Sequence, residues 1–234
     1  MREVPGGTDV LGELLAAAPV TVVETRADSA DPFLFPEEAA AVANAVDQRR
    51  REFATVRHCA RTALGTLGVP PAPIVPGDKG APRWPAGFVG SMTHCAGYRA
   101  AAVARDAAVV SIGIDAEPAA PISDPGVLPL ISHESERTAL AALGERHPHV
   151  PWDRLLFSAK ESVYKTWFPL TGLWLGFEEA RLDLAPDGTF TAELLVPGPT
   201  VAGERLGGFS GRWLIRDGIA VTAIVLPVTP PPGT

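Results

Sequence analysis

Apolar residues recur every three or four positions in two long stretches of the chain, which is the pattern of amphipathic helices. The first stretch covers residues 37–67 and divides at Asp47. Gly68 and the Pro70-Pro71 pair beyond it predict where this helix ends. The second stretch covers residues 152–168, and a shorter helix is predicted over 134–143. The sequence therefore predicts one long helix early in the chain and another late.

Short apolar segments bounded by Gly, Pro and Asp predict β-strands. Residues 69–87 and 118–130 are rich in Pro or Gly and are predicted to be loops. The turn sequences Pro186-Asp187-Gly188 and Asp217-Gly218 predict hairpins near the C-terminus. Three strands are expected between the long helices and four after them, over residues 88–93, 98–104, 107–115, 180–184, 190–196, 209–215 and 220–226.

A helix followed by strands occurs twice along the chain. This repetition predicts an α+β fold of two similar α/β halves that meet near residue 110, an N-terminal half over 1–110 and a C-terminal half over 111–234. At 234 residues the chain is long enough to bury a core of this kind. The first ten residues and the Pro-rich tail from about residue 227 are predicted to be disordered.

Composition and charge exclude several classes of protein. The apolar runs are too short to span a bilayer, and the N-terminus lacks the apolar segment of a signal peptide, so a cytoplasmic location without a membrane partner is expected. The formal net charge of −7 argues against a general nucleic-acid binder. Cys59 and Cys95 are isolated in the sequence, which argues against a structural zinc site or a disulfide.

Two carboxylates stand at the end of the predicted strand 107–115. Asp115 and Glu117 are two positions apart, so in an extended chain their side chains point to the same face. Adjacent carboxylates repel each other unless a proton or a cation lies between them. A strand end that simply frays into solvent is an equally good reading of this pair taken alone.

The late helix places charged residues among aromatic ones. Glu161 shares a helical stripe with Phe157, Tyr164 and Phe168. Lys160 lies in the adjacent stripe, which is otherwise apolar. An ion pair between Glu161 and a lysine four residues later is the simpler interpretation, but it does not explain the apolar flanks. A buried charge must be paired or must hold a metal, and the stripe therefore favours a functional carboxylate.

Asp115, Glu117 and Glu161 together form an all-oxygen set of ligands. Such a set suits Mg²⁺ or Mn²⁺, with water and a phosphate completing the coordination. Lys160 and Lys165 add positive charge beside the same predicted site. Metal and lysine together stabilise the charge that develops on phosphate oxygens during phosphoryl transfer.

Further basic residues lie upstream and have two interpretations each. Arg49, Arg50, Arg57 and Arg61 stand on the early helix and form either a solvated basic face or a binding site for an anion. Lys79 follows a Gly-Asp pair that lacks the spacing of a nucleotide-binding P-loop. His94 ends a predicted strand and is either a functional residue or a hydrogen-bonded structural histidine.

Three motifs in this order resemble those of the phosphopantetheinyl transferases of the large surfactin-synthetase-activating type. The first is a Gly/Pro-rich loop, Gly77–Pro82, that runs into the strand Gly90–His94. The second is Gly-Ile-Asp-Ala-Glu at 113–117, and the third is Phe-Ser-Ala-Lys-Glu-Ser-Val-Tyr-Lys at 157–165. The second and third motifs at this separation are specific to the family.

Flanking segments resemble the actinobacterial branch of that family. They are Phe168-Pro-Leu, Trp174-Leu-Gly-Phe177 and Val56-Arg-His-Cys-Ala-Arg61. The resemblance covers residues 45–180 and implies two α+β halves with the active site in the cleft between them.

The resemblance also implies the reaction and its partners. The 4′-phosphopantetheine group of coenzyme A would pass to a serine of an apo acyl or peptidyl carrier protein, releasing adenosine 3′,5′-bisphosphate in a Mg²⁺-dependent reaction. The carrier's pathway (fatty-acid, polyketide or nonribosomal-peptide) stays open. Two halves in one chain would make a monomer sufficient. The alternatives are a non-catalytic coenzyme A-binding module and another Mg²⁺-dependent phosphoryl-transfer enzyme.

Roles follow for the matching positions. Asp115, Glu117 and Glu161 would hold Mg²⁺, and Glu161 would also be the general base. The implied catalytic pair is Glu161 and Lys165. The residues implied in binding coenzyme A are Arg49, Arg57, Lys79, Thr93, His94, Asp115, Lys160 and Lys165.

Overall fold

The computed structural model describes residues 9–28 and 33–228. Most of the predicted disordered segments, residues 1–8 and 229–234, lie outside these ranges. The neighbouring residues are ordered, since Val10 begins a helix and Pro227 ends a strand. Within the described residues no helix is both long enough and apolar enough to cross a membrane.

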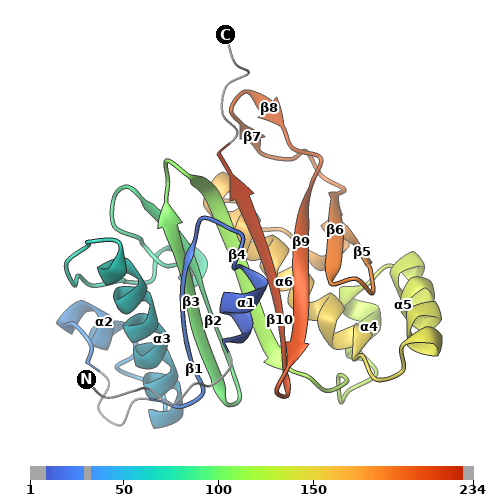
Figure 1. Ribbon diagram of the computed structural model, residues 1–234, viewed down its shortest axis with the longest axis horizontal. Coiled ribbons are helices and arrows are strands. Elements are labelled where there is room, and N and C mark those ends of the chain that lie inside the picture. The colour runs from blue at the N-terminus through green and yellow to red at the C-terminus, as the bar shows by residue number, and fades with distance from the viewer. Residues whose placement is uncertain (1–8, 29–32, 229–234) are drawn as a thin grey trace.

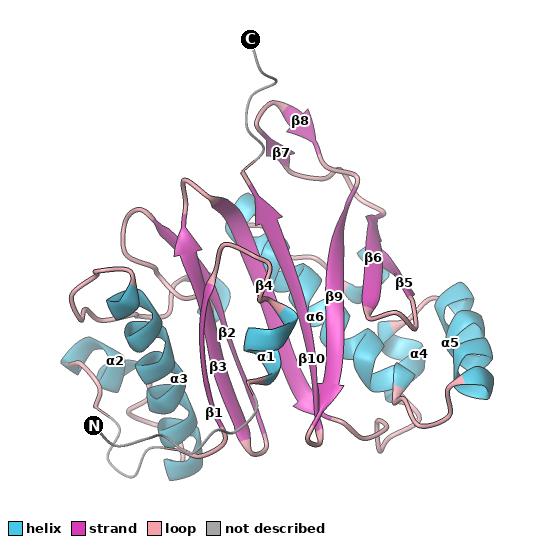
Figure 2. Cartoon of the chain, in the orientation of Figure 1, coloured by secondary structure: helices cyan, strands magenta, loops and turns pink. Residues whose placement is uncertain are grey.

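Two antiparallel sheets form the body of the molecule (Figures 1 and 2). The first has the strand order β1-β3-β2 and the second β4-β10-β9-β6-β5. A small hairpin of β7 and β8 projects from the second sheet (Figure 1). The strands are β1 (Thr21–Thr25), β2 (Phe88–Cys95), β3 (Tyr98–Arg105), β4 (Val109–Pro118), β5 (Ala180–Leu184), β6 (Thr189–Leu194), β7 (Thr200–Val201), β8 (Glu204–Arg205), β9 (Gly208–Arg216) and β10 (Ile219–Pro227).

Helices cover both faces of the sheets. The long helix α3 packs on the first sheet and the long helix α6 on β4 and β10. The short α1 lies against the opposite face, in front of the sheets in Figure 1. The smaller helices α4 and α5 flank α6 at one end (Figure 1). The helices are α1 (Val10–Leu14), α2 (Pro36–Ala41), α3 (Asp47–Thr66), α4 (Val127–Ile131), α5 (Glu134–Arg146) and α6 (Trp152–Thr171), with short 3₁₀ turns at η1 (Asp78–Gly80) and η2 (Phe177–Glu179).

The side chains of β10 alternate between two faces of the sheet, each of which is covered by a helix. Val221 and Ala223 pack toward α1, whereas Ala220 and Ile224 pack toward α6. Successive side chains of a strand point to opposite faces, and both faces are covered here, so nearly every position of β10 is apolar.

The two sheets meet along β2 and β4, which lie side by side. Hydroxyl groups join them: Ile114 N donates to Ser91 Oγ at 3.2 Å and Ala116 N donates to Thr93 Oγ1 at 3.0 Å. Buried backbone amides need acceptors, and along this seam side-chain oxygens of β2 supply them. The functional residues of β2 and β4 are thereby held next to each other, between α3 and α6.

The predicted α+β class and two sheet-bearing halves are confirmed, as are most of the predicted strands and the helices later found as α3, α5 and α6. The predicted division at Asp47 is confirmed, since α3 begins there, but the helix predicted over residues 37–46 is wrong in its second half, because α2 ends at Ala41 and turns follow it. The loop 118–130 is wrong at its end, where α4 forms. The boundary after residue 110 remains a prediction; one apolar cluster contains residues of both sheets, so they share a core.

Gly113 permits the close approach of α6 to β4. A Cβ atom at this position would lie 2.0 Å from Ser162 O and 2.3 Å from Thr166 Oγ1, far inside van der Waals contact. Because one of these atoms is helix backbone, the side chain cannot be accommodated by a rotamer change.

We expect Gly113→Ala to lower the free energy of unfolding by about 1–3 kcal/mol, the usual cost of overpacking. Urea denaturation measures this change. Gly144→Ala is the matched control, because a Cβ there meets nothing within 4 Å and helical alanine is favoured over glycine. Equal stability of Gly113→Ala and the wild type would contradict the packing described.

Candidate active site

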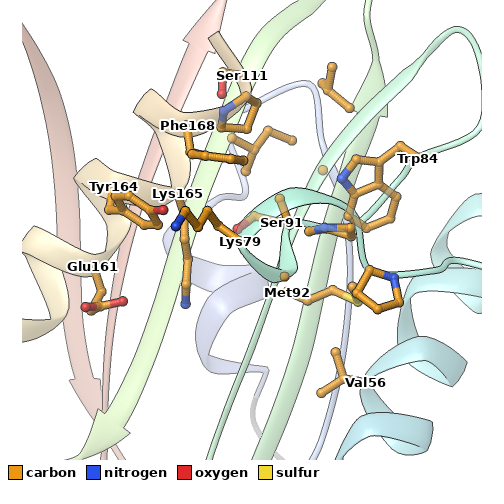
Figure 3. A pocket seen from close by; sticks show the side chains of 18 of the residues that line it. Val56, Lys79, Trp84, Ser91, Met92, Ser111, Glu161, Tyr164, Lys165 and Phe168 are labelled. Carbon is orange, nitrogen blue, oxygen red and sulfur yellow. The ribbon is translucent and has the colours of Figure 1, made fainter. Parts of the chain in front are cut away.

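A cavity of about 670 Å³ lies over the seam between the sheets (Figure 3). One wall comes from α3, a second from α6, the floor from β2 and β4, and a lip from the loop that contains η1. In Figure 3, Glu161, Tyr164, Lys165 and Phe168 project from α6 opposite Val56, Met92 and Trp84. This volume is typical of sites for small molecules and cofactors.

Asp115 lies beside this cavity and is almost fully buried. Its Oδ1 accepts hydrogen bonds from Lys165 Nζ at 2.8 Å and from Thr93 Oγ1 at 3.2 Å. Its Oδ2 is buried without a hydrogen-bond partner. Burying a carboxylate oxygen without a partner costs free energy, so Asp115 Oδ2 is well suited to be a ligand of a cation.

Glu117 and Glu161 are influenced by the charge of Asp115. Burial and then Asp115 raise the pKa of Glu117, against the opposing effect of Arg154, whose Nη1 donates to Glu117 Oε2 at 3.0 Å. Burial also raises the pKa of Glu161; Lys165 opposes this effect and Asp115 reinforces it. The negative charge of Asp115 thus disfavours the charged forms of both Glu117 and Glu161. A cation bound between the three carboxylates would offset this repulsion.

The described residues contain no group of three or more His, Cys, Asp or Glu side chains already gathered to hold a metal ion. Lys165 and Arg154 instead neutralise Asp115 and Glu117 in this structure. The three carboxylates nevertheless fit a hard cation, because Asp115 Oδ2 lacks a partner and Asp115 raises the pKa of each of the other two.

Arg49 and His94 lie together on the α3 side of the cavity. Arg49 Nη1 is 2.5 Å from His94 Nε2, and Glu52 lies 3.5 Å from the same nitrogen. Burial and then Arg49 lower the pKa of His94, which favours the neutral ring. A neutral imidazole beside an arginine is a hydrogen-bonding partner for a phosphate group rather than a second permanent charge.

Arg57 is buried at the base of the same wall. Its Nε donates to Ile74 O at 2.8 Å, and its guanidinium stacks over the Phe53 ring, 3.2 Å from the centroid. Burial lowers the pKa of Arg57 to about 10, so the group stays charged at neutral pH. Glu38, which has no exposed surface, supplies the nearby negative charge and is paired with Arg61 at 2.8 Å.

Two other arginines of the early helix, Arg50 and Arg61, have structural partners. Arg50 donates to the carbonyls of Ala43 and Ala45, and Arg61 also donates to Phe33 O. Neither lines the cavity. The upstream basic residues thus divide, with Arg49 and Arg57 facing the cavity.

Lys79 lines the cavity from the loop and is exposed. Its backbone has φ 53°, in the left-handed region that a lysine adopts at a cost of about 1–2 kcal/mol. Such backbone strain is tolerated where neighbouring structure fixes it, here by the bridge between Pro76 and Pro82.

The prediction that Lys160 binds a phosphate is not supported. Its Nζ is buried and donates to Glu136 Oε2 at 3.1 Å, Phe177 O at 2.8 Å and Ala180 O at 2.9 Å, which uses all three of its protons. It does not line the large cavity but a second one of about 170 Å³, which Glu161, Tyr164 and Trp174 also line. Lys160 therefore holds the segment after α6 in place.

Thr93 is placed differently from its predicted role as well. It is buried, does not line the large cavity, and uses its hydroxyl to accept from Ala116 N and donate to Asp115 Oδ1. Thr93 thus orients a site carboxylate and does not face the ligand space.

The partners of the site residues could not be predicted from the sequence. Glu38, Glu52, Glu136 and Arg154 each hold a predicted site residue or its neighbour. The only signal in the sequence was their charge within otherwise apolar or helical stretches, and their partners are distant in the chain.

Comparisons with known proteins show the family to which the sequence is similar. The model of the 4′-phosphopantetheinyl transferase N-terminal domain matches residues 37–104, and that of the 4′-phosphopantetheinyl transferase superfamily matches residues 111–211. The chain is 64% identical over 202 residues to 4′-phosphopantetheinyl transferase Svp of Streptomyces mobaraensis, covering 86% of this chain and 81% of that protein.

Two further relatives match along almost their whole length. 4′-Phosphopantetheinyl transferase PptT of Mycobacterium tuberculosis is 50% identical, with 92% of this chain and 99% of that protein covered. 4′-Phosphopantetheinyl transferase Npt of Nocardia iowensis is 48% identical, with 87% and 97% covered.

Lys160→Ala is expected to lower the free energy of unfolding by about 3–5 kcal/mol, because it leaves the buried Glu136 carboxylate without its counter-charge. Thermal and urea denaturation measure the loss. Lys79→Ala, at an exposed lysine, should leave stability unchanged. A Lys160→Ala protein as stable as the wild type would show that the lysine is not the structural element described.

Proposed function

The chain belongs to the 4′-phosphopantetheinyl transferase superfamily and transfers the phosphopantetheine group of coenzyme A to carrier proteins, and we propose that the cavity between α3 and α6 is where it does so. In this proposal, coenzyme A lies along the seam with its phosphates near Lys165 and His94. The serine of the carrier protein approaches from the side of Glu161.

The distribution of charge supports this placement of coenzyme A. Arg49, Arg57 and His94 on one wall would meet the 3′-phosphate and a neighbouring phosphate, and Lys165 on the other would meet the pyrophosphate. Arginine and lysine bind phosphates through charge-assisted hydrogen bonds. Apolar side chains between the walls, Trp84 and Met92 among them, suit the adenine (Figure 3). Lys79 lines the cavity from the loop, and in Figure 3 its side chain extends toward Tyr164 and Lys165.

Asp115, Glu117 and Glu161 would hold Mg²⁺, which supplies positive charge to the pyrophosphate oxygens when bound. Glu161 takes the proton of the serine hydroxyl, directly or through a water molecule. The serine oxygen bonds to the β-phosphorus of coenzyme A, the bond from that phosphorus to the bridging oxygen breaks, and adenosine 3′,5′-bisphosphate leaves with that electron pair. Lys165 hydrogen-bonds a phosphate oxygen while this charge develops.

One observation carries the catalytic assignment. Glu161 lines the cavity, burial raises its pKa, and Lys165 and Asp115 lie close enough to act on that pKa, Lys165 lowering it and Asp115 raising it. A carboxylate with this environment is a better proton acceptor than a solvated one. A module that only binds coenzyme A would not need it.

Finer features of the family are also part of the proposal. We place the chain in the large surfactin-synthetase-activating type and its actinobacterial branch, which the relatives from Streptomyces, Mycobacterium and Nocardia support. The acceptors are acyl or peptidyl carrier proteins, and the enzyme acts as a cytoplasmic monomer without nucleic-acid or membrane partners.

Glu161→Gln tests the assignment of the base. Incubation with coenzyme A, Mg²⁺ and an apo carrier protein, followed by intact mass spectrometry of the carrier, should show one added phosphopantetheine with the wild type. The variant should lose about 10²- to 10⁴-fold in initial rate while keeping its unfolding midpoint, because a general base contributes a factor of this size.

Two controls accompany this measurement. Glu145→Gln, at an exposed glutamate of α5, should transfer at the wild-type rate. Chelation with EDTA should abolish the mass gain with the wild type. Wild-type turnover by Glu161→Gln would remove the base assignment, and undiminished transfer in EDTA would remove the metal.

A further inference from the structure

Two side chains in the first turn of α6 form hydrogen bonds with the loop that follows Glu117 and β4. Arg154 Nε donates to Ala120 O at 3.1 Å and Arg154 Nη2 to Pro121 O at 3.4 Å. Asp153, the preceding residue, accepts a hydrogen bond from Ile122 N at 2.9 Å. Both side chains therefore anchor the same short loop to the helix.

Arg154 differs from Asp153 in also contacting Glu117. It does so through one hydrogen bond, from Arg154 Nη1 to Glu117 Oε2 at 3.0 Å. The other two nitrogens of the guanidinium donate to the loop carbonyls. One carboxylate oxygen of Glu117 is thus held in place. The second oxygen is left for another ligand.

The guanidinium is well suited to orient this carboxylate. Both partners are mostly buried, with side-chain exposures of 20% and 19%, so water screens the pair only in part. The planar fork of arginine is fixed by three acceptors at once, which removes the rotational freedom that a lone ion pair would have.

The position of Arg154 on α6 links it to the rest of the site. It lies seven residues before Glu161, two helical turns, or about 10.5 Å along the axis, and therefore on the same side of the helix. The same helix carries Lys165, which holds Asp115. One rigid element thus positions the carboxylates of β4 relative to its own Glu161.

We propose that Arg154 is a positioning residue of the metal site, which fixes Glu117 so that its free oxygen faces the divalent cation together with Asp115 and Glu161. The inference rests on the proposed function, because it takes these carboxylates as ligands of Mg²⁺. Residues that hydrogen-bond metal ligands fix ligand orientation, and their loss weakens metal binding by about 10- to 100-fold.

Isothermal titration of the full chain with Mg²⁺ in the presence of coenzyme A tests the proposal. Arg154→Gln should weaken Mg²⁺ binding about 10- to 100-fold. Its affinity for coenzyme A in the absence of Mg²⁺ should stay at the wild-type value, because Arg154 does not line the large cavity. Arg154→Lys should fall between the two proteins, since lysine keeps the charge but cannot form the fork.

Asp153→Asn is the matched control, because it weakens the same loop anchor without touching Glu117. It should bind Mg²⁺ as the wild type does. Equal loss of affinity in both variants would show that loop anchoring alone is responsible, and tighter binding by Arg154→Gln would show that Arg154 competes with the cation; either result overturns the proposal.

Two further outcomes complete the test. Should Arg154→Gln fail to fold, the comparison of Arg154→Lys with Asp153→Asn decides in the same way. A wild-type protein that binds coenzyme A but no Mg²⁺ would refute the metal assignment in the proposed function. A wild type that binds Mg²⁺ alongside unaffected Arg154 variants would refute only the role of Arg154.

Discussion

Two hydroxyl groups on β2 connect the halves of the molecule. Ser91 and Thr93 accept the amide protons of Ile114 and Ala116, and so satisfy buried donors of β4 where the two sheets meet. The cavity lies over this seam, and Asp115 stands between the two bonded amides of β4. Because Thr93 also donates to Asp115, the same contact that joins the sheets orients a site carboxylate.

The charges of the site are neutralised from within the chain. Lys165 pairs with Asp115, Arg154 with Glu117, and Arg49 with Glu52. Pairing reduces the cost of burying these groups, and it also fixes their side chains before any ligand arrives. Phosphate and cation would then bind to groups already held in position, which lowers the entropy lost on binding.

Local pattern was sufficient to find the site but not to assign every residue in it. The i, i+2 spacing placed Asp115 and Glu117 on the face of β4 toward α6, where Lys165 and Arg154 reach them. The helical stripe correctly separated Lys160 from Glu161. It could not show what faces each stripe, and Lys160 meets Glu136, a glutamate 24 residues away in sequence.

Other features were equally invisible to periodicity. Helix α1 has five residues and β1 five, too few for a clear pattern, and both are held by contacts with distant strands. The end of α2 at Ala41 was missed too, because residues 42–46 contain no Gly or Pro, although the division at Asp47 was predicted. Tertiary contacts decide such segments, and a single sequence does not contain them.

The proposed mechanism depends most on three carboxylates, from two elements, that bind one cation beside coenzyme A. A crystal structure of the wild type with coenzyme A and Mn²⁺ locates that cation directly, through an anomalous difference map that shows the manganese. We expect one anomalous peak within coordination distance of the carboxylates of Asp115, Glu117 and Glu161, and next to the pyrophosphate of coenzyme A. An anomalous peak away from these carboxylates, or electron density for coenzyme A outside the cavity between α3 and α6, would contradict the proposed mechanism.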